Sequence, residues 1–257
     1  VSFPVIGLLG SGGAVFALAV LAAVSAYCFG ASRRAYALAA LALLVPLLFP
    51  SLTQVRMSPY RGLEHALRYP GARHLETYET GFSRVDIFKS PAVRFAPGLN
   101  VNYLNDLPLQ VGLAVDGAGI TAITNTSGES LSFLGELPSA LPYELRERNR
   151  VCVIDPKGGL PVLLARHAGA REVIAMESDP LVLRAVRQYP DRFTGGIYGK
   201  DTRSGLARSR LLMMPGGFDL IDLSLMGSAP FGVYGASEDY RLTREAFGVY
   251  LDSLAPE

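Results

Sequence analysis

The stretch VCVIDPKGGLPVLLARHAGAREVIAMESDP, from Val151 to Pro180, decides the fold of this chain. An apolar strand leads into a glycine-containing turn, a helix follows, and a second apolar strand ends at Glu177. This order predicts a βαβ unit of the nucleotide-binding kind. The turn, however, reads Asp155-Pro156-Lys157-Gly158-Gly159, whereas a cofactor-binding turn begins with glycines. The stretch therefore predicts the architecture of a cofactor site and leaves its chemistry open.

Strands and helices continue to alternate after this stretch. The segment DPLVLRAVRQY predicts a helix with Asp179 as its N-cap and Pro180 in its first turn. FDLIDLSL then predicts a strand and LTREAFGVYLDSL an amphipathic helix. Residues 150–257 are thus expected to form an α/β domain with a doubly wound, mostly parallel sheet. Such a sheet ordinarily continues with another strand, so we expect the domain to be incomplete at its C-terminal end.

The preceding part of the chain has a different pattern. Residues 56–82 predict a polar connector with a short helix from Gly62 to Arg68, and residues 83–149 a small β-domain with a linking helix that is broken at Pro138. In RVDIFKS, alternation places Val85 and Ile87 inside and Asp86 and Lys89 outside. Asp116-Gly117 is a hairpin signal between two short apolar runs.

The first 55 residues are almost free of charge. Only Arg33 and Arg34 interrupt two uncharged runs, Val1–Ser32 and Ala35–Val55, and each run can supply the roughly 20 residues of a membrane-spanning helix. Residues 1–55 therefore predict two transmembrane helices. A cleaved signal peptide for the first run, or two buried core helices, are the alternatives. Because the chain starts at Val1, we expect it to be part of a longer protein.

The arginines suggest an orientation and a location. Four arginines between residues 56 and 73 outnumber the pair at residues 33–34, which favours a cytoplasmic soluble domain. Over the whole chain, 24 basic residues face 23 acidic ones, so charge gives no reason to expect nucleic acid. Two cysteines and three histidines are scattered without ligand spacing, and we expect no metal site.

From about Tyr60 to Glu257 the chain resembles the spermidine synthase (aminopropyltransferase) family, in particular its membrane-fused bacterial members. The resemblance rests on the order of these pieces along the chain: SPYRGLEHAL, RVDIFKSPAVRFAPGL, LAVDGAGITAIT, LPSALPYEL, the βαβ unit, FDLIDLSL and SEDYRLTREAFGVYLDSLAP. It implies a small β-domain followed by a methyltransferase-like Rossmann domain. Active members bind S-adenosylmethionine or its decarboxylated form and transfer a group to an amine.

The resemblance also assigns cofactor-binding residues. Gly158 and Gly159 match the glycine-rich turn, while Asp155 and Lys157 stand where glycines are expected. Glu177 lies 19 residues after Gly158 (177 − 158), where an acid accepts hydrogen bonds from ribose hydroxyls. Asp201 resembles an acid that contacts adenine. The alternatives are an exposed acid beside a helix cap for Glu177 and a surface aspartate in a loop for Asp201.

The expected catalytic carboxylates are displaced or absent. Aminopropyl transfer needs a carboxylate to hold the amine and take its proton, yet Ser224 and Gly227 occupy the corresponding places. Asp222 is either a displaced catalytic acid or a hydrogen-bonded structural residue. A polar segment follows that either binds a polyamine substrate or caps the last helix: Glu238, Asp239 and Tyr240.

These departures predict a membrane-anchored, spermidine synthase-like protein with a degenerate active site and no bound cofactor. Its expected role is that of a non-catalytic accessory or scaffold subunit, with the lipid bilayer and other membrane subunits as partners. The alternative is an active aminopropyltransferase or S-adenosylmethionine-dependent methyltransferase that acts on an amine or a membrane-associated acceptor. In that case S-adenosylmethionine or its decarboxylated form is the cofactor and a polyamine becomes a partner.

Overall fold

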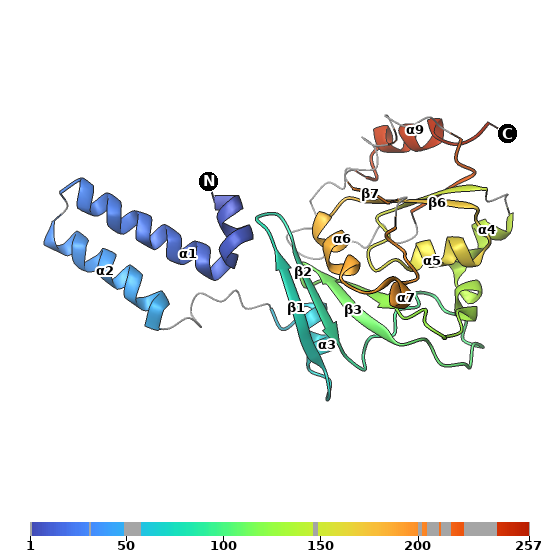
Figure 1. Cartoon of the computed structure of the whole chain (residues 1–257), viewed down its shortest axis with the longest axis horizontal. Helices are drawn as coiled ribbons and strands as arrows, with labels where there is room; N and C mark the ends of the chain where they lie inside the picture. The colour runs from blue at the N-terminus through green and yellow to red at the C-terminus, as the bar shows by residue number, and fades with distance from the viewer. Residues whose placement is uncertain are drawn as a thin grey trace.

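The computed structural model of the chain describes residues 2–30, 32–48, 58–145, 149–199, 202–204, 211, 217–223 and 241–256. Over these residues the chain forms an N-terminal pair of helices, an antiparallel sheet and a parallel sheet with helices on its faces (Figure 1). The helix pair extends away from the two sheets, which pack together as one body (Figure 1).

The N-terminal helices are α1 (Ser2–Cys28) and α2 (Arg33–Leu48), which run side by side as a hairpin (Figure 1). Gly10 interrupts α1 with a non-helical φ of 71° and ψ of 175°. A search of the described residues finds no helix with both the length and the apolar character that crossing a membrane requires. The prediction of two transmembrane helices over residues 1–55 therefore has no support from the described structure.

The antiparallel sheet has the strand order β1-β2-β3-β4. Its strands are β1 (Arg73–Glu79), β2 (Arg84–Lys89), β3 (Gln110–Val115) and β4 (Gly119–Thr124), so β1 lies within the range expected to be a connector. The predicted hairpin turn is confirmed, since Asp116 and Gly117 join β3 to β4 with φ values of 51° and 68°. The predicted short helix is α3 (Gly62–Leu67), which packs against β4.

Both faces of β2 are covered. Val85 and Ile87 face the parallel sheet as expected, while Phe88 packs against Leu63 and Ala66 of α3 on the opposite face. The expectation that Asp86 is exposed is wrong, because its side chain is fully buried on the α3 side of β2. The interior accepts this carboxylate because side chains around it donate hydrogen bonds: Thr77 Oγ1 at 2.6 Å, Arg84 Nε at 2.9 Å and His74 Nε2 at 2.9 Å.

The parallel sheet has the order β7-β6-β5-β8, so its strands lie third, second, first and fourth in chain order. They are β5 (Arg150–Ile154), β6 (Glu172–Glu177), β7 (Thr202–Ser204) and β8 (Leu220–Asp222). This order, with helices between the strands, confirms the predicted α/β fold with a mostly parallel sheet. After α9 (Arg244–Asp252) the chain returns beside this sheet, where Ala255 N donates to the Phe218 carbonyl at 2.8 Å.

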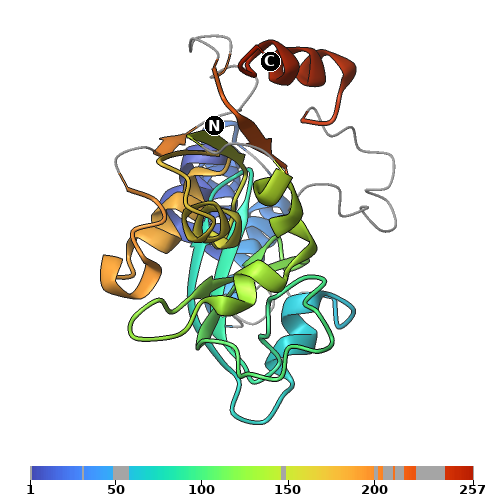
Figure 2. The same cartoon turned by 90° about the vertical axis from the view of Figure 1, so that its right-hand side faces the viewer.

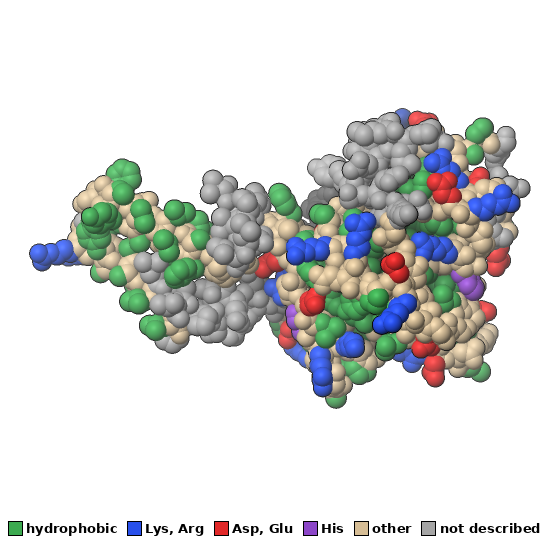
Figure 3. Space-filling view, in the orientation of Figure 1, with side chains coloured by type: hydrophobic (Ala, Val, Ile, Leu, Met, Phe, Trp, Pro, Cys, Tyr) green, Lys and Arg blue, Asp and Glu red, His purple; other side chains and the backbone are tan. Residues whose placement is uncertain are grey.

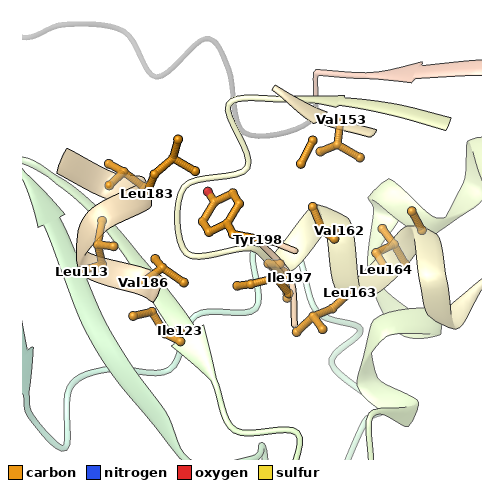
Figure 4. Close-up of a cluster of buried hydrophobic side chains, with 14 of the residues drawn as sticks. Leu113, Ile123, Val153, Val162, Leu163, Leu164, Leu183, Val186, Ile197 and Tyr198 are labelled. Carbon is orange, nitrogen blue, oxygen red and sulfur yellow. The ribbon is translucent and has the colours of Figure 1, made fainter. Parts of the chain in front are cut away.

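Helices lie on both faces of the parallel sheet. Val151 and Val153 of β5 pack toward α5 (Leu160–His167) and α6 (Pro180–Arg187), whereas Cys152 and Ile154 pack toward α9. Figure 4 shows part of the first of these cores, in which Leu113 and Ile123 of the antiparallel sheet lie beside Val186 of α6. Val162 of α5 belongs to the same core. The two sheets therefore share one hydrophobic core, and its burial fixes their relative position.

The segment between the two sheets holds three short helices where the sequence predicted one helix broken at Pro138. They are η2 (Ser132–Glu136), η3 (Pro138–Ala140) and α4 (Leu141–Leu145). Pro138 begins η3, where its missing N–H costs no hydrogen bond. The short helix α7 (Asp191–Thr194) follows α6 and contacts β4.

The buried Asp86 network gives the first testable prediction. Burial tends to raise the pKa of Asp86, but hydrogen bonds from Arg84, Thr77 and His74 prevail and lower it. Because the pKa of Asp86 is lower in the folded state than in the unfolded state, its ionised carboxylate stabilises the fold at pH values above the unfolded-state pKa. This stabilisation is lost progressively as the pH falls below about 5. We therefore expect Asp86→Asn to lower the unfolding free energy by about 3 kcal/mol at pH 7. The unfolding free energy of this variant should also fall less steeply between pH 7 and pH 3, as measured by urea denaturation over that range.

Asp106→Asn is the matched control, because Asp106 is exposed in a loop and undergoes the same chemical change. We expect this control to shift the unfolding free energy by less than about 0.5 kcal/mol. Equal effects of the two substitutions would contradict a structural role for the buried carboxylate.

Candidate functional site at the carboxyl edge of the parallel sheet

The candidate site lies where β5 and β6 end side by side. β5 ends at Ile154 and β6 at Glu177, and these strands are paired in parallel register. On its other side β5 pairs with β8, so the strand order reverses at β5. In open α/β sheets this switch point, at the carboxyl ends of the strands, is where ligands bind.

The turn after β5 follows a left-handed backbone path at non-glycine positions. Asp155 and Lys157 have φ values of 49° and 53°, and Gly159 has 94°. Glycine adopts this region without a steric penalty, whereas a residue with a Cβ is strained there. The turn therefore keeps a glycine-type backbone while carrying a carboxylate and an ammonium group.

The two glycines that match the family pattern serve packing within the protein. A Cβ on Gly158 would lie 2.2 Å from the Ala122 carbonyl oxygen of β4, and a Cβ on Gly159 would lie 2.1 Å from Ile197 Cδ1. The clash at Gly158 is with backbone, which cannot move aside, and Gly159 has a φ of 94° that strains any residue with a Cβ, so both positions favour glycine whether or not a ligand binds. The glycines alone are thus no sign of a nucleotide site.

Glu177 is completely buried, and donors from the protein surround it. Lys157 Nζ donates to Oε1 at 2.8 Å and Lys157 N donates to Oε2 at 3.1 Å. Asp179 N donates to Oε1 at 3.0 Å, and the Tyr198 hydroxyl lies 3.3 Å from Oε2 while it also contacts the Lys157 carbonyl. A carboxylate accepts about four hydrogen bonds, so internal partners nearly saturate Glu177.

Burial shifts the pKa values of Glu177 and Tyr198. It raises the pKa of Glu177 above its usual value, although the positive charge of Lys157 works in the opposite direction. Burial also raises the pKa of Tyr198, as does the negative charge of Glu177, and the phenol therefore stays protonated. Figure 4 shows Tyr198 with its hydroxyl pointing away from Ile197.

Asp155 is the second buried carboxylate of this edge. Its oxygens accept from Ser178 N at 2.8 Å and from Arg241 Nη1 at 2.5 Å. Burial tends to raise its pKa, but the charge of Lys157 and the bonds from Arg241 and Ser178 together lower it. The two buried carboxylates of this edge, Asp155 and Glu177, are thus paired with two bases, Arg241 and Lys157.

Asp179 joins this edge to the antiparallel sheet. Its Oδ1 accepts from Leu181 N at 2.8 Å, which confirms the predicted N-cap of α6. Its Oδ2 accepts from Ser83 Oγ at 2.5 Å, and Ser83 lies in the turn between β1 and β2. The segment from Glu177 to Asp179 is therefore held from both sides.

Asp222 lies one strand away, in β8. It is paired in register with Val153, is buried, and accepts a hydrogen bond of 2.6 Å from the Tyr143 hydroxyl. Burial and the negative charge of Asp222 raise the pKa of Tyr143. Asp222 is thus a hydrogen-bonded interior aspartate, and its catalytic role stays a prediction.

Four predicted site residues lie outside the described part of the chain: Asp201, Glu238, Asp239 and Tyr240. Ser224 and Gly227, which stand where catalytic carboxylates are expected, also lie outside it. Within the described part, no group of three or more His, Cys, Asp or Glu side chains could hold a metal ion. Sequence reasoning missed Tyr198 and Arg241. Arg241 follows the acidic pair in SEDYR, and no pattern in the sequence pointed from it to Asp155.

Comparison with protein-family models and with curated proteins gives no match. Among solved structures the chain is similar to a spermidine synthase from Thermotoga maritima, with 19% identity and a TM-score of 0.45 over 71% of this chain and 53% of that one. It is also similar to a spermidine synthase in complex with the transition-state analogue AdoDATO, with 20% identity and a TM-score of 0.46 over 71% and 55%. The chain thus spans about half the length of these proteins, and the likeness concerns the fold alone.

The pair of Lys157 and Glu177 yields a prediction about stability. Lys157→Met leaves the buried Glu177 carboxylate without its counter-ion, and Glu177→Gln removes the carboxylate that is hydrogen-bonded to the ammonium group of a largely buried lysine. We expect each single substitution to lower the unfolding free energy by about 3 kcal/mol, since breaking one side of a buried pair strands the other charge.

The double variant, Lys157→Met with Glu177→Gln, should be less destabilised than the sum of the two single variants by about 2 kcal/mol. Urea denaturation of all four proteins measures this coupling energy. Additive effects would show that the two side chains do not interact in the folded protein.

Proposed function

We propose that this chain is a spermidine synthase-like scaffold whose nucleotide-binding edge no longer takes a cofactor, and that it serves as a non-catalytic accessory or scaffold subunit. The ion pair between Lys157 and Glu177 is the observation that carries this proposal. It supplies from within the chain the hydrogen bonds and the charge balance that a bound ligand would otherwise supply.

The hydrogen bonds already made at this edge argue against a nucleoside there. A ribose diol needs free acceptor positions on the carboxylate, yet the oxygens of Glu177 already accept from Lys157 Nζ, Lys157 N and Asp179 N. A ligand that replaced the ammonium group would leave a largely buried cation to be solvated elsewhere. Asp155 offers no alternative, because Ser178 and Arg241 already donate to it.

The apolar hairpin supports an association with lipid or with apolar membrane subunits. Figure 3 shows hydrophobic side chains over α1 and α2, with basic side chains at the far tip. Large apolar side chains are exposed along the hairpin: Val15, Phe16, Leu18, Val20, Leu21, Val24, Tyr27, Phe29, Tyr36, Leu38, Leu41, Leu44 and Leu48. An apolar surface of this kind marks an interaction site, and we propose that the remaining domain faces the cytoplasm of a bacterial cell.

One observation favours the alternative of an active transferase. Glu177 closes β6, and the resemblance implies that an acid at this place binds ribose hydroxyls in active relatives. An active protein would transfer an aminopropyl or a methyl group, with Asp222 as its candidate acid. That protein would require Lys157 to leave Glu177 when the cofactor binds.

Calorimetric titration separates the two proposals. We expect S-adenosylmethionine and its decarboxylated form to bind with a dissociation constant weaker than about 1 mM, because each ligand competes with Lys157 for Glu177. Binding in the micromolar range to the unmodified protein would overturn the scaffold proposal.

Turnover of a radiolabelled donor with polyamines tests the alternative. If turnover is found, Glu177→Ala should abolish it, since the transferase proposal places Glu177 at the cofactor. Turnover that survives Glu177→Ala would show that the chemistry takes place away from this edge.

A further inference from the structure

A pocket of about 750 Å³ lies on the antiparallel sheet, between α3 and β4. Its lining includes Tyr60, Gly62, His65, Ala66, Arg68 and Ile120. Figure 2 shows α3 on the outer side of the antiparallel sheet, well away from α9. The pocket is therefore separate from the edge that holds Glu177.

The walls of this pocket are fixed by contacts at both ends of α3. Leu63 N donates to the Gly117 carbonyl at 3.1 Å, and Ser90 Oγ donates to the Ala66 carbonyl at 2.6 Å. A Cβ on Gly62 would lie 3.0 Å from Ile120 Cδ1, so glycine lets α3 approach β4 closely. The pocket is thus preformed, and a ligand need not order it.

The chemistry of the lining points to an anion. Arg68 and His65 are exposed one helical turn apart, and the described lining residues include no acid. The one acid of α3, Glu64, is not part of the lining. Ala66 and Ile120 form an apolar floor, and Tyr60 is 96% exposed at the rim. A guanidinium group above an apolar floor suits a phosphate that is attached to a less polar group.

The position of the pocket along the chain indicates where that phosphate comes from. Residues 35–55 carry no charge, and the pocket-lining residues begin at Pro59. Between residues 56 and 73 the chain has four arginines and a single acid. A basic segment directly after an apolar one binds anionic lipid headgroups, and exposed tyrosines settle at the interface. We propose that this pocket binds the phosphate headgroup of an anionic phospholipid. This inference rests on the proposed membrane association.

Sedimentation with lipid vesicles tests the proposal on the full chain. Vesicles of phosphatidylcholine with phosphatidylglycerol should bind the protein more tightly than phosphatidylcholine alone. Arg68→Gln should weaken binding to the anionic vesicles about fivefold. Arg94→Gln is the matched control, since Arg94 is exposed in a nearby loop outside the lining, and its effect should stay within about twofold. Equal losses in the two variants would mean diffuse attraction to the surface and would overturn the pocket proposal.

A soluble headgroup separates the pocket from membrane association in general. Glycerol 3-phosphate should shift the NMR resonances of His65 and Tyr60 in the unmodified protein but not in Arg68→Gln. If the His65 resonances do not shift, the pocket proposal is overturned. Equal affinity for the two vesicle types would also overturn it, but would leave the proposed membrane association intact. Shifts without binding to any vesicle would assign the pocket to free phosphate compounds and overturn the lipid assignment. None of these outcomes bears on cofactor binding at Glu177, which the calorimetric titration tests separately.

Discussion

The carboxyl edge of the parallel sheet depends on one buried ion pair, between Lys157 and Glu177. A buried pair is costly because both charges lose water, and it persists only where further hydrogen bonds compensate. Here Lys157 binds Glu177 with its side-chain ammonium group and with its backbone amide. One residue can do both only if the turn brings its amide and its side chain to the same carboxylate. The left-handed conformation at Lys157 allows this, so backbone strain of about 1–3 kcal/mol is offset by the contacts it makes possible.

This arrangement changes the meaning of the glycines beside it. Gly158 lies against the Ala122 carbonyl of β4, and Gly159 lies against Ile197. The antiparallel sheet therefore braces the turn from one side, and Ser83 braces the neighbouring segment through Asp179. Glycines in a turn of this kind can allow a ligand to approach the backbone closely, and they can also allow the two sheets to pack closely. In this chain the packing requirement is visible at both glycines.

Local signals predicted the elements of the fold but not their partners. The βαβ unit, the Asp179 cap and the Asp116-Gly117 hairpin follow from periodicity and turn chemistry over a few residues, and all three are confirmed. Asp86 shows where this reasoning stops. Alternation along β2 separated two faces correctly, yet it could not show that α3 covers the second face or that His74 and Thr77 of β1 supply hydrogen bonds there.

The candidate site was limited in the same way. The sequence located Glu177 at the end of β6, because strand length and the spacing from the turn are local properties. It could also show that Lys157 stands where glycine is expected. It could not show that Lys157 bonds to Glu177, or that Arg241 reaches Asp155 across 86 residues. Both contacts depend on tertiary packing that brings separate segments to one edge.

The distribution of charge argues that this edge and the outer surface have different roles. At the edge, Asp155 and Glu177 are matched by Arg241 and Lys157, so the field they present to a ligand is small. Around α3, by contrast, Arg68 and His65 line a pocket without an acid among its lining residues. A protein recognises charged molecules where its own charges are unbalanced and accessible, since balanced pairs gain little by exchanging partners. This contrast is why we propose that charged molecules are recognised at the surface around α3, while the balanced ion pairs at the edge of the parallel sheet contribute to the stability of the fold.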